Sequence, residues 1–282
     1  MDLMRFSIRN LVVPAFLVLA GLCAVTSAQA DAVRTGFNTT DFGPSDDGST
    51  AATALGFTAN FFGTSYTNVF MNNNGNITFD AALGTYTPFN LFTNNTRIIA
   101  PFFGDVDTRG TLSSTMHYGS GIVDGHNAFG VTWDGVGYFS SKTDKLNKFQ
   151  SILIDRSDTG SGNFDFELNY NQIQWETGDD SGGTNGLGGS SARAGYSDGT
   201  QAHSLELTGS GVSGGYLDTN LATGLIHNSI NSDVLGRYDF FVRNGGVAAV
   251  SPADTPEPSN IALFLCMGVS GSLFLRRHRR KA

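Results

Sequence analysis

The sequence predicts an all-β protein: a mainly antiparallel β-sandwich of short strands with at most one or two short helices. The composition of the 282 residues favours this class, because 22 Phe provide core material and 36 Gly provide turns. Residues 164–170, FDFELNY, are apolar at every second position, as a half-buried strand requires. With 40% hydrophobic and only 15% charged residues, a disordered body is disfavoured.

The first 30 residues have the features of a secretory signal peptide and are not expected to belong to the fold. Two arginines precede an apolar run over 11–25, and Ala28 and Ala30 place small side chains where signal peptidase recognises its substrate. Cleavage is expected before Asp31. The alternative, a lipoprotein signal ending at Cys23, would need a smaller residue than the leucine that precedes this cysteine.

The exported chain is acidic and has no disulfide. Removal of residues 1–30 leaves Cys266 as the single thiol, so no intramolecular disulfide can form. Residues 31–255 carry 10 basic and 23 acidic side chains, a formal net charge of −13. This charge argues against nucleic acid or an anionic lipid surface as a partner. The body is long enough to bury a core of its own.

Two apolar runs joined across Asn74-Gly75 predict a β-hairpin, since Asn-Gly tolerates the positive φ angles of a type I′ turn. A two-residue loop would set Phe70 opposite Phe79 and make one face of the hairpin mostly apolar. Thr78 and Asp80 would then lie on the other face.

Short apolar or alternating runs predict the remaining strands. They lie at 98–103, 115–118, 128–133, 149–154, 164–170, 193–196, 204–207 and 237–243, with a loop at 119–127. The alternation changes phase after Tyr170, which predicts a bulge at Asn171-Gln172. Low-complexity residues 178–191 are expected to form an exposed loop, and 214–226 is the best candidate for a short helix. One core is expected to unite Phe70, Ile77, Phe79, Phe102, Trp133, Leu153, Phe166, Leu168, Ile173 and Trp175.

The region around the hairpin resembles the nidogen-like (NIDO) extracellular domain. That family pairs an aromatic segment, FFG..YT.V..N.NG.I.F, with a second motif, I.APF..DVDTR. The matching residues here are Phe61-Phe62-Gly63, Tyr66-Thr67, Val69, Asn74-Gly75, Ile77, Phe79, Ile99-Ala100-Pro101-Phe102 and Asp105-Val106-Asp107-Thr108-Arg109. The resemblance covers residues 55–199 and implies that residues 31–247 form one NIDO-like sandwich domain.

Acidic residues after the 98–103 strand are candidate calcium ligands. Asp105 and Asp107 begin like an EF-hand loop, but an arginine stands at position five and a methionine at position twelve, so it is not an EF-hand. The two carboxylates could still share a calcium ion, although neutralisation by Arg109 as an ion pair is favoured. Asp46-Asp47 could also hold a cation, but a solvated loop is the expected state.

Two motifs that suggest catalysis have weak support. Residues 195–199, GYSDG, match the nucleophile elbow of α/β-hydrolases, which requires a turn from a strand into a helix; a strand followed by a plain turn is expected here. Glu167 and Glu176 could pair as acid and base for glycoside hydrolysis, but alternation places Glu167 on the solvent face. No catalytic residue, zinc site or cofactor is predicted.

The C-terminal segment, residues 256–282, resembles the PEP-CTERM sorting signal of Gram-negative bacteria. After a linker at 248–255 come Pro256, Glu257 and Pro258, an apolar run at 261–275, and the basic residues Arg276, Arg277, Arg279, Arg280 and Lys281. As a helix the run would span about 22 Å, less than a hydrocarbon core of about 30 Å, so it would be a marginal membrane helix. The resemblance implies an inner-membrane intermediate, cleavage by an exosortase, and a link to exopolysaccharide or biofilm.

The sequence therefore predicts an exported cell-surface or extracellular-matrix adhesion module without enzymatic activity. Signal peptidase and exosortase would process it, the inner membrane would hold it transiently, and its partner would be a matrix protein or polysaccharide. One alternative is a secreted carbohydrate-binding or glycan-active β-sandwich. Another is a structural protein that stays tethered because its tail is never cut.

Overall fold

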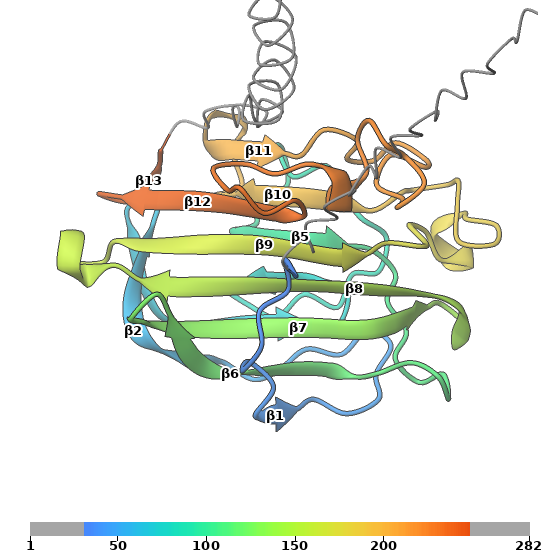
Figure 1. The fold of residues 1–282 in the computed structure, drawn as a ribbon, viewed down its shortest axis with the longest axis horizontal. Helices are drawn as coiled ribbons and strands as arrows, with labels where there is room; N and C mark the ends of the chain where they lie inside the picture. The colour runs from blue at the N-terminus through green and yellow to red at the C-terminus, as the bar shows by residue number, and fades with distance from the viewer. Residues whose placement is uncertain (1–30, 249–282) are drawn as a thin grey trace, which may run out of the picture.

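A computed structural model describes residues 31–248, which form two antiparallel β-sheets packed face to face (Figure 1). The fold class predicted from the sequence is confirmed for these residues. None of their helical segments is long and apolar enough to cross a membrane. The predicted signal peptide, most of the linker and the sorting segment with its membrane helix lie outside the described residues.

The seven-stranded sheet has the order β1-β6-β7-β8-β9-β12-β13. In that order its strands span Thr40–Asp41, Met116–Val123, His126–Tyr138, Lys142–Asp155, Phe164–Gln172, Arg237–Arg243 and Gly246–Val247. The six-stranded sheet has the order β11-β10-β5-β4-β3-β2. Its strands span Ser204–Glu206, Arg193–Ser197, Ile98–Phe103, Asn76–Thr78, Thr64–Asn72 and Thr53–Phe61.

One large apolar core lies between the sheets and contains nine of the ten predicted core residues. Phe166 stacks on Phe240, with ring centroids 4.8 Å apart, and meets Tyr196 of the other sheet edge-on at 5.6 Å. Phe70 is the exception, since it is only partly buried and lies outside the core. The inward positions of β3 are Val69 and Met71.

The register predicted for the first hairpin is wrong by one residue. Phe70 pairs with Thr78, and Asn72 pairs with Asn76, so the loop has three residues, 73–75. Gly75 has φ +76° and closes the loop by donating its N–H to the carbonyl of Asn72 at 3.1 Å. Thr78 is consequently buried rather than on an open face.

Strands β6 and β7 are longer than predicted, because the loop between them is only Asp124-Gly125. Three glycines lie within the paired region, and a Cβ on Gly130 would stand 2.5 Å from the ring of Phe37. Gly121 leaves room for the same ring. Glycine in these strands therefore makes space for a segment that crosses the outer face of the sheet.

That segment is the N-terminal strap, residues 31–39, which runs over β9, β8, β7 and β6 in Figure 1. The N–H groups of Ala32 and Val33 donate to Oδ1 of Asn171 at 3.0 and 3.1 Å. The N–H groups at Nε and Nη2 of Arg34 donate to Oε2 and Oε1 of Glu167, both at 2.8 Å. Phe37 packs in a small second core with residues from β6, β7 and β8.

Strand β9 matches residues 164–170, but it is buried on both faces. Glu167 is 4% exposed, so the prediction that it faces solvent is wrong: the N-terminal strap covers it. The predicted bulge is confirmed, because the β8 pairing shifts between Tyr170 and Gln172. This shift returns Ile173 and Trp175 to the core.

Two predictions for the loops are wrong. Residues 178–191 are not simply an exposed loop: they contain a 3-10 turn, Asp179–Ser181, and fold back so that Ser190 N–H donates to the Ser181 carbonyl. Residues 214–226 form no α-helix, and only Leu225–His227 is a 3-10 turn. The segment is instead held by Glu176, whose carboxylate accepts the N–H groups of Gly214 and Tyr216.

Both ends of the described chain are attached to β12. The guanidinium of Arg237, at the start of β12, donates to the carbonyls of Asp31 and Ala32 at 3.3 and 3.0 Å. At the other end, β13 pairs with the last residues of β12, and Ala248 N–H donates to the carbonyl of Phe241 at 2.8 Å.

Candidate cation site

The β3–β4 loop joins two segments that are distant in sequence. The Asn73 side-chain amide donates to the carbonyl of Asp46 at 2.5 Å and to that of Val106 at 2.7 Å. The Asn74 amide donates to Oδ1 of Asp47 at 2.8 Å, and its Oδ1 accepts the Val106 N–H at 2.9 Å. The loop thus holds residues 45–47 against the segment that follows β5.

Close packing against β5 explains why glycine occupies position 75. A Cβ at this position would stand 1.8 Å from the carbonyl oxygen of Phe102, a distance no side chain can adopt. The backbone also has φ +76°, which favours glycine. The Asn-Gly pair that predicts a turn therefore also allows the loop to touch β5.

A second pair of bonds fixes the same two segments. Thr108 N–H donates to the carbonyl of Ser45, and Ser45 N–H donates to the hydroxyl of Thr108, both at 2.8 Å. Trp133 anchors the loop from the core by donating its indole N–H to the Asn73 carbonyl at 2.9 Å. The backbone around the candidate site is therefore held from several directions.

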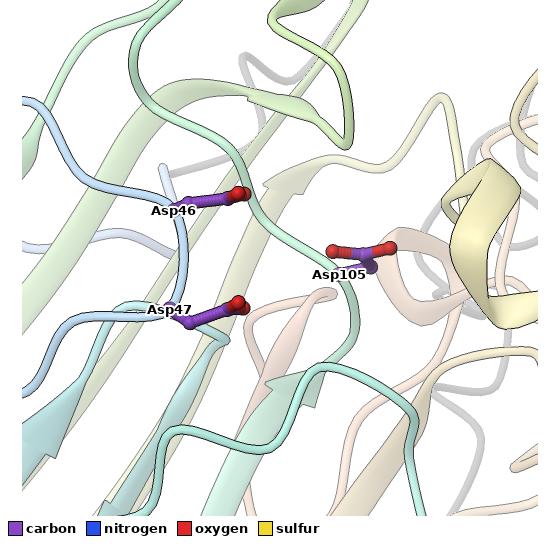
Figure 2. A group of neighbouring side chains, drawn as sticks. All are labelled: Asp46, Asp47 and Asp105. Carbon is purple, nitrogen blue, oxygen red and sulfur yellow. The ribbon is translucent and has the colours of Figure 1, made fainter.

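Three carboxylates converge between these segments, those of Asp46, Asp47 and Asp105 (Figure 2). One oxygen from each lies within 4.8 Å of one oxygen from each of the others. Asp46 and Asp47 extend side by side toward the segment that carries Asp105. Asp105 is only 1% exposed, and neither of its carboxylate oxygens has a hydrogen-bond partner among the described residues.

Burial and repulsion from neighbouring carboxylates disfavour the charged forms of Asp105 and Asp46. Burial, together with the charges of Asp46, Asp47 and Asp180, raises the pKa of Asp105 to about 8. Burial also raises the pKa of Asp46 to about 6, with further repulsion from Asp107 and Asp47 and partial compensation by Arg109. Arg109 partly neutralises Asp46 through an ion pair at 2.7 Å, but it forms no ion pair with Asp105, whose raised pKa favours the protonated form when no cation is bound.

Asp107 has different surroundings. Arg109 donates Nε and Nη2 to the two oxygens of Asp107 at 2.9 and 2.7 Å, and Ser141 N–H donates to Oδ2 at 2.7 Å. Burial alone would raise the pKa of Asp107, but these hydrogen bonds outweigh it and hold the pKa below its usual range. The favoured ion pair is thus present for Asp107, whereas Asp105 lies outside it.

The ligand set of this site is oxygen only, which suits a hard cation such as calcium. Asp105 was a candidate from the sequence, but its neighbours Asp46 and Asp47 were expected to form a solvated loop. The structural roles of Asn73 and Asn74 were missed. The run of three asparagines before Gly75 was the available signal, because asparagine side chains commonly satisfy backbone groups in tight loops.

The other candidate catalytic groups are engaged elsewhere. The Asp198 carboxylate pairs with Nδ1 of His203 at 2.7 Å, but Ser197 Oγ is bonded to Ser204 Oγ and to Gly199 N–H. Strand β10 leads into a 3-10 turn and β11, so the strand–turn–helix context of a nucleophile elbow is not formed.

Glu167 and Glu176 are likewise committed to structural contacts. Glu167 is bound by Arg34 of the N-terminal strap, and Glu176 holds the backbone of residues 214–216. The proposed acid–base pair for glycoside hydrolysis would need both carboxylates free at one cleft. Their observed partners argue against that role.

Comparison with known proteins identifies the family. The nidogen-like domain model matches residues 67–122 and 112–244. Alpha-tectorin of Mus musculus is 32% identical over an alignment of 189 residues, and the match covers 58% of this chain and 8% of that protein. Nidogen of Drosophila melanogaster is 32% identical over an alignment of 135 residues, and the match covers 39% of this chain and 10% of that protein.

The matched region is therefore a small part of these much longer relatives. No solved structure matches the chain. The family model nevertheless spans more than half of the chain and includes most of the strands of both sheets, leaving out β1, β2 and β13. The chain belongs to the nidogen-like domain family.

Proposed function

We propose that this protein is an exported structural or adhesion module of the cell surface or extracellular matrix, delivered through its C-terminal sorting segment. The observation that carries the proposal is the order of features in the tail: Pro256-Glu257-Pro258, an apolar run at 261–275, and a basic cluster behind it. The tail follows a domain of a family whose relatives include alpha-tectorin and nidogen.

The charge distribution supports a route through the inner membrane. Arg276, Arg277, Arg279 and Arg280 follow the apolar run, and the positive-inside bias keeps such residues on the cytoplasmic side. That orientation leaves Pro256-Glu257-Pro258 on the outer side, next to the exported domain. An exosortase acting there would release the body, with its net charge of −13, to a matrix protein or polysaccharide.

Processing can be tested by mass spectrometry of the secreted and outer-surface fractions. The mature protein should end close to Pro258, and no peptide from 261–282 should be found outside the cell. Replacing Pro256, Glu257 and Pro258 by alanine should retain the protein in the inner membrane. Pro252→Ala, a proline outside the motif, is the matched control and should be released normally. Recovery of the intact C-terminus from extracellular material would contradict the proposal.

Carbohydrate recognition ranks second. A sugar-binding face built on stacking needs exposed aromatic side chains close together. Among the described residues, the aromatic side chains with large exposure are Tyr86 and Phe241, which lie in the β4–β5 connection and on β12 of the opposite sheet. Binding of the exported protein to glycans on an array of glycans and matrix proteins would support carbohydrate recognition, whereas binding to matrix proteins alone would count against it.

A further inference from the structure

We propose that Asp46, Asp47 and Asp105 bind a calcium ion that fastens the 45–47 loop to the segment after β5. The site goes beyond the function proposed above and does not depend on how the tail is processed. It is assembled from two segments separated by more than fifty residues, and both belong to the described domain.

The spacing of the three carboxylates suits a single ion. Calcium binds oxygen at about 2.3–2.6 Å, so two ligands of one ion can lie up to about 5 Å apart. One oxygen from each of the three aspartates falls within 4.8 Å of the others. Figure 2 shows Asp46 and Asp47 approaching from one loop and Asp105 from the facing segment.

The state of Asp105 is the observation that distinguishes this site from an ordinary acidic cluster. The side chain is 1% exposed, and neither carboxylate oxygen has a hydrogen-bond partner among residues 31–248. A buried carboxylate without a partner is costly, and proteins normally pair it or bind it to a metal. Arg109 forms ion pairs with Asp107 and with Oδ2 of Asp46, each at 2.7 Å, but it forms none with Asp105.

The surroundings hold the ligands in place before an ion arrives. Asn73 fixes the Asp46 carbonyl, and Asn74 binds the side chain of Asp47. Gly178 leaves room for Asp105, because a Cβ at that position would stand 2.0 Å from its Oδ2. Little rearrangement is therefore needed for the three side chains to share a cation, which favours binding.

The ligand chemistry favours calcium over other common divalent ions. Zinc prefers nitrogen and sulfur ligands, and this cluster offers carboxylates only. Magnesium demands near-ideal octahedral geometry and keeps several waters, whereas calcium accepts irregular sets of carboxylates and loop carbonyls. Extracellular calcium modules typically bind with dissociation constants of about 10⁻⁴–10⁻³ M.

Thermal unfolding of the full-length chain tests the site. The protein would be purified in mild detergent, treated with a chelator, and unfolded with and without about 10 mM CaCl₂. An ion with the affinity above should raise the midpoint by about 3–10 °C. Isothermal titration with CaCl₂ should give one site per chain.

Two variants and one control connect the effect to the site. Asp105→Asn keeps the shape of the side chain but removes its charge, and it should abolish the calcium-dependent rise. Asp47→Asn should also abolish the rise. Because Asp47 is exposed, the loss of the calcium response in this variant would not result from misfolding. Asp124→Asn is the matched control: this aspartate lies in the β6–β7 turn with a side chain 81% exposed, and the variant should keep the full rise.

The outcomes discriminate clearly. No rise in the unmodified chain, or an equal rise in all three variants, would overturn the proposal. A rise of the same size with MgCl₂ in place of CaCl₂ would contradict the assignment to calcium.

Discussion

Asp239 on β12 should make the domain less stable as the pH rises. Its cross-strand neighbour is Glu167, and its Oδ1 is buried without a hydrogen-bond partner. Burial and repulsion from Glu167, offset in part by Arg237 and Arg34, raise the pKa of Asp239 from 3.8 to about 7. Asp165 on β9 adds further repulsion. The folded state therefore retains a proton that the unfolded chain has already released.

The sign and size of the effect follow from proton linkage. Between about pH 4 and pH 7 the folded state binds more protons than the unfolded state, so the free energy of unfolding falls as the pH rises. The stability that protonated Asp239 contributes is fully present below the pKa of this group in the unfolded chain. It is lost as the pH rises through the pKa of the group in the folded state. At about 1.4 kcal/mol per pKa unit, the loss between pH 5 and pH 8 amounts to about 2–3 kcal/mol.

Asp239→Asn removes the titrating group while keeping the shape of the side chain. Urea unfolding of the original chain and the variant at pH 5 and pH 8, at one fixed calcium concentration, measures the difference in free energy. The variant should gain about 2–3 kcal/mol relative to the original chain on going to pH 8. Asp233→Asn, an exposed aspartate in the preceding loop, is the control and should follow the original chain. Parallel pH profiles for Asp239→Asn and the original chain would refute the reasoning.

Three further results are expected. Phe166→Ala, in the centre of the core against Phe240, should reduce the free energy of unfolding by about 3–5 kcal/mol in denaturant titration, and a loss below about 1 kcal/mol would contradict the packing described. Gly130→Val should displace the N-terminal strap and speed proteolysis near the N-terminus, because its Cβ would meet the ring of Phe37. Adding Phe37→Ala should relieve the clash and slow proteolysis again. Unchanged proteolysis in the double variant would argue against this contact. Ser197→Ala should leave any esterase activity of the purified protein unchanged, whereas abolished activity would restore the nucleophile-elbow interpretation.

Local patterns in the sequence predicted the strands well. Residues 164–170 and 237–243 became β9 and β12, because alternation and β-branched or aromatic content act within a few residues. The hairpin register was not predictable from Asn74-Gly75 alone. The local sequence favours a two-residue turn at Asn74-Gly75. The loop instead has three residues, and in this conformation the Asn73 side chain bonds to the carbonyls of Asp46 and Val106.

Contacts between distant segments account for the other differences. The alternation of β9 separates its two faces, but it does not show that the N-terminal strap covers the polar one. Arg34 and Glu167 are 133 residues apart, and no local pattern links them. In the same way, a motif pointed to Asp105, while its association with Asp46 and Asp47 depends on how the β3–β4 loop brings the two segments together.

The attachment of both chain ends to β12 determines how this domain would carry a mechanical load. A force applied between residues 31 and 248 would enter the seven-stranded sheet at β12 and at the adjacent β9, whose Asn171 binds Ala32 and Val33, and not across the sandwich. It would first pull Asp31 and Ala32 from Arg237 and separate β13 from the end of β12. Peeling bonds one after another needs less force than breaking them together, so extension would begin at this edge. The cluster of Asp46, Asp47 and Asp105 lies outside these first contacts and would keep its geometry until later, so the domain would lengthen by a short distance before losing that site.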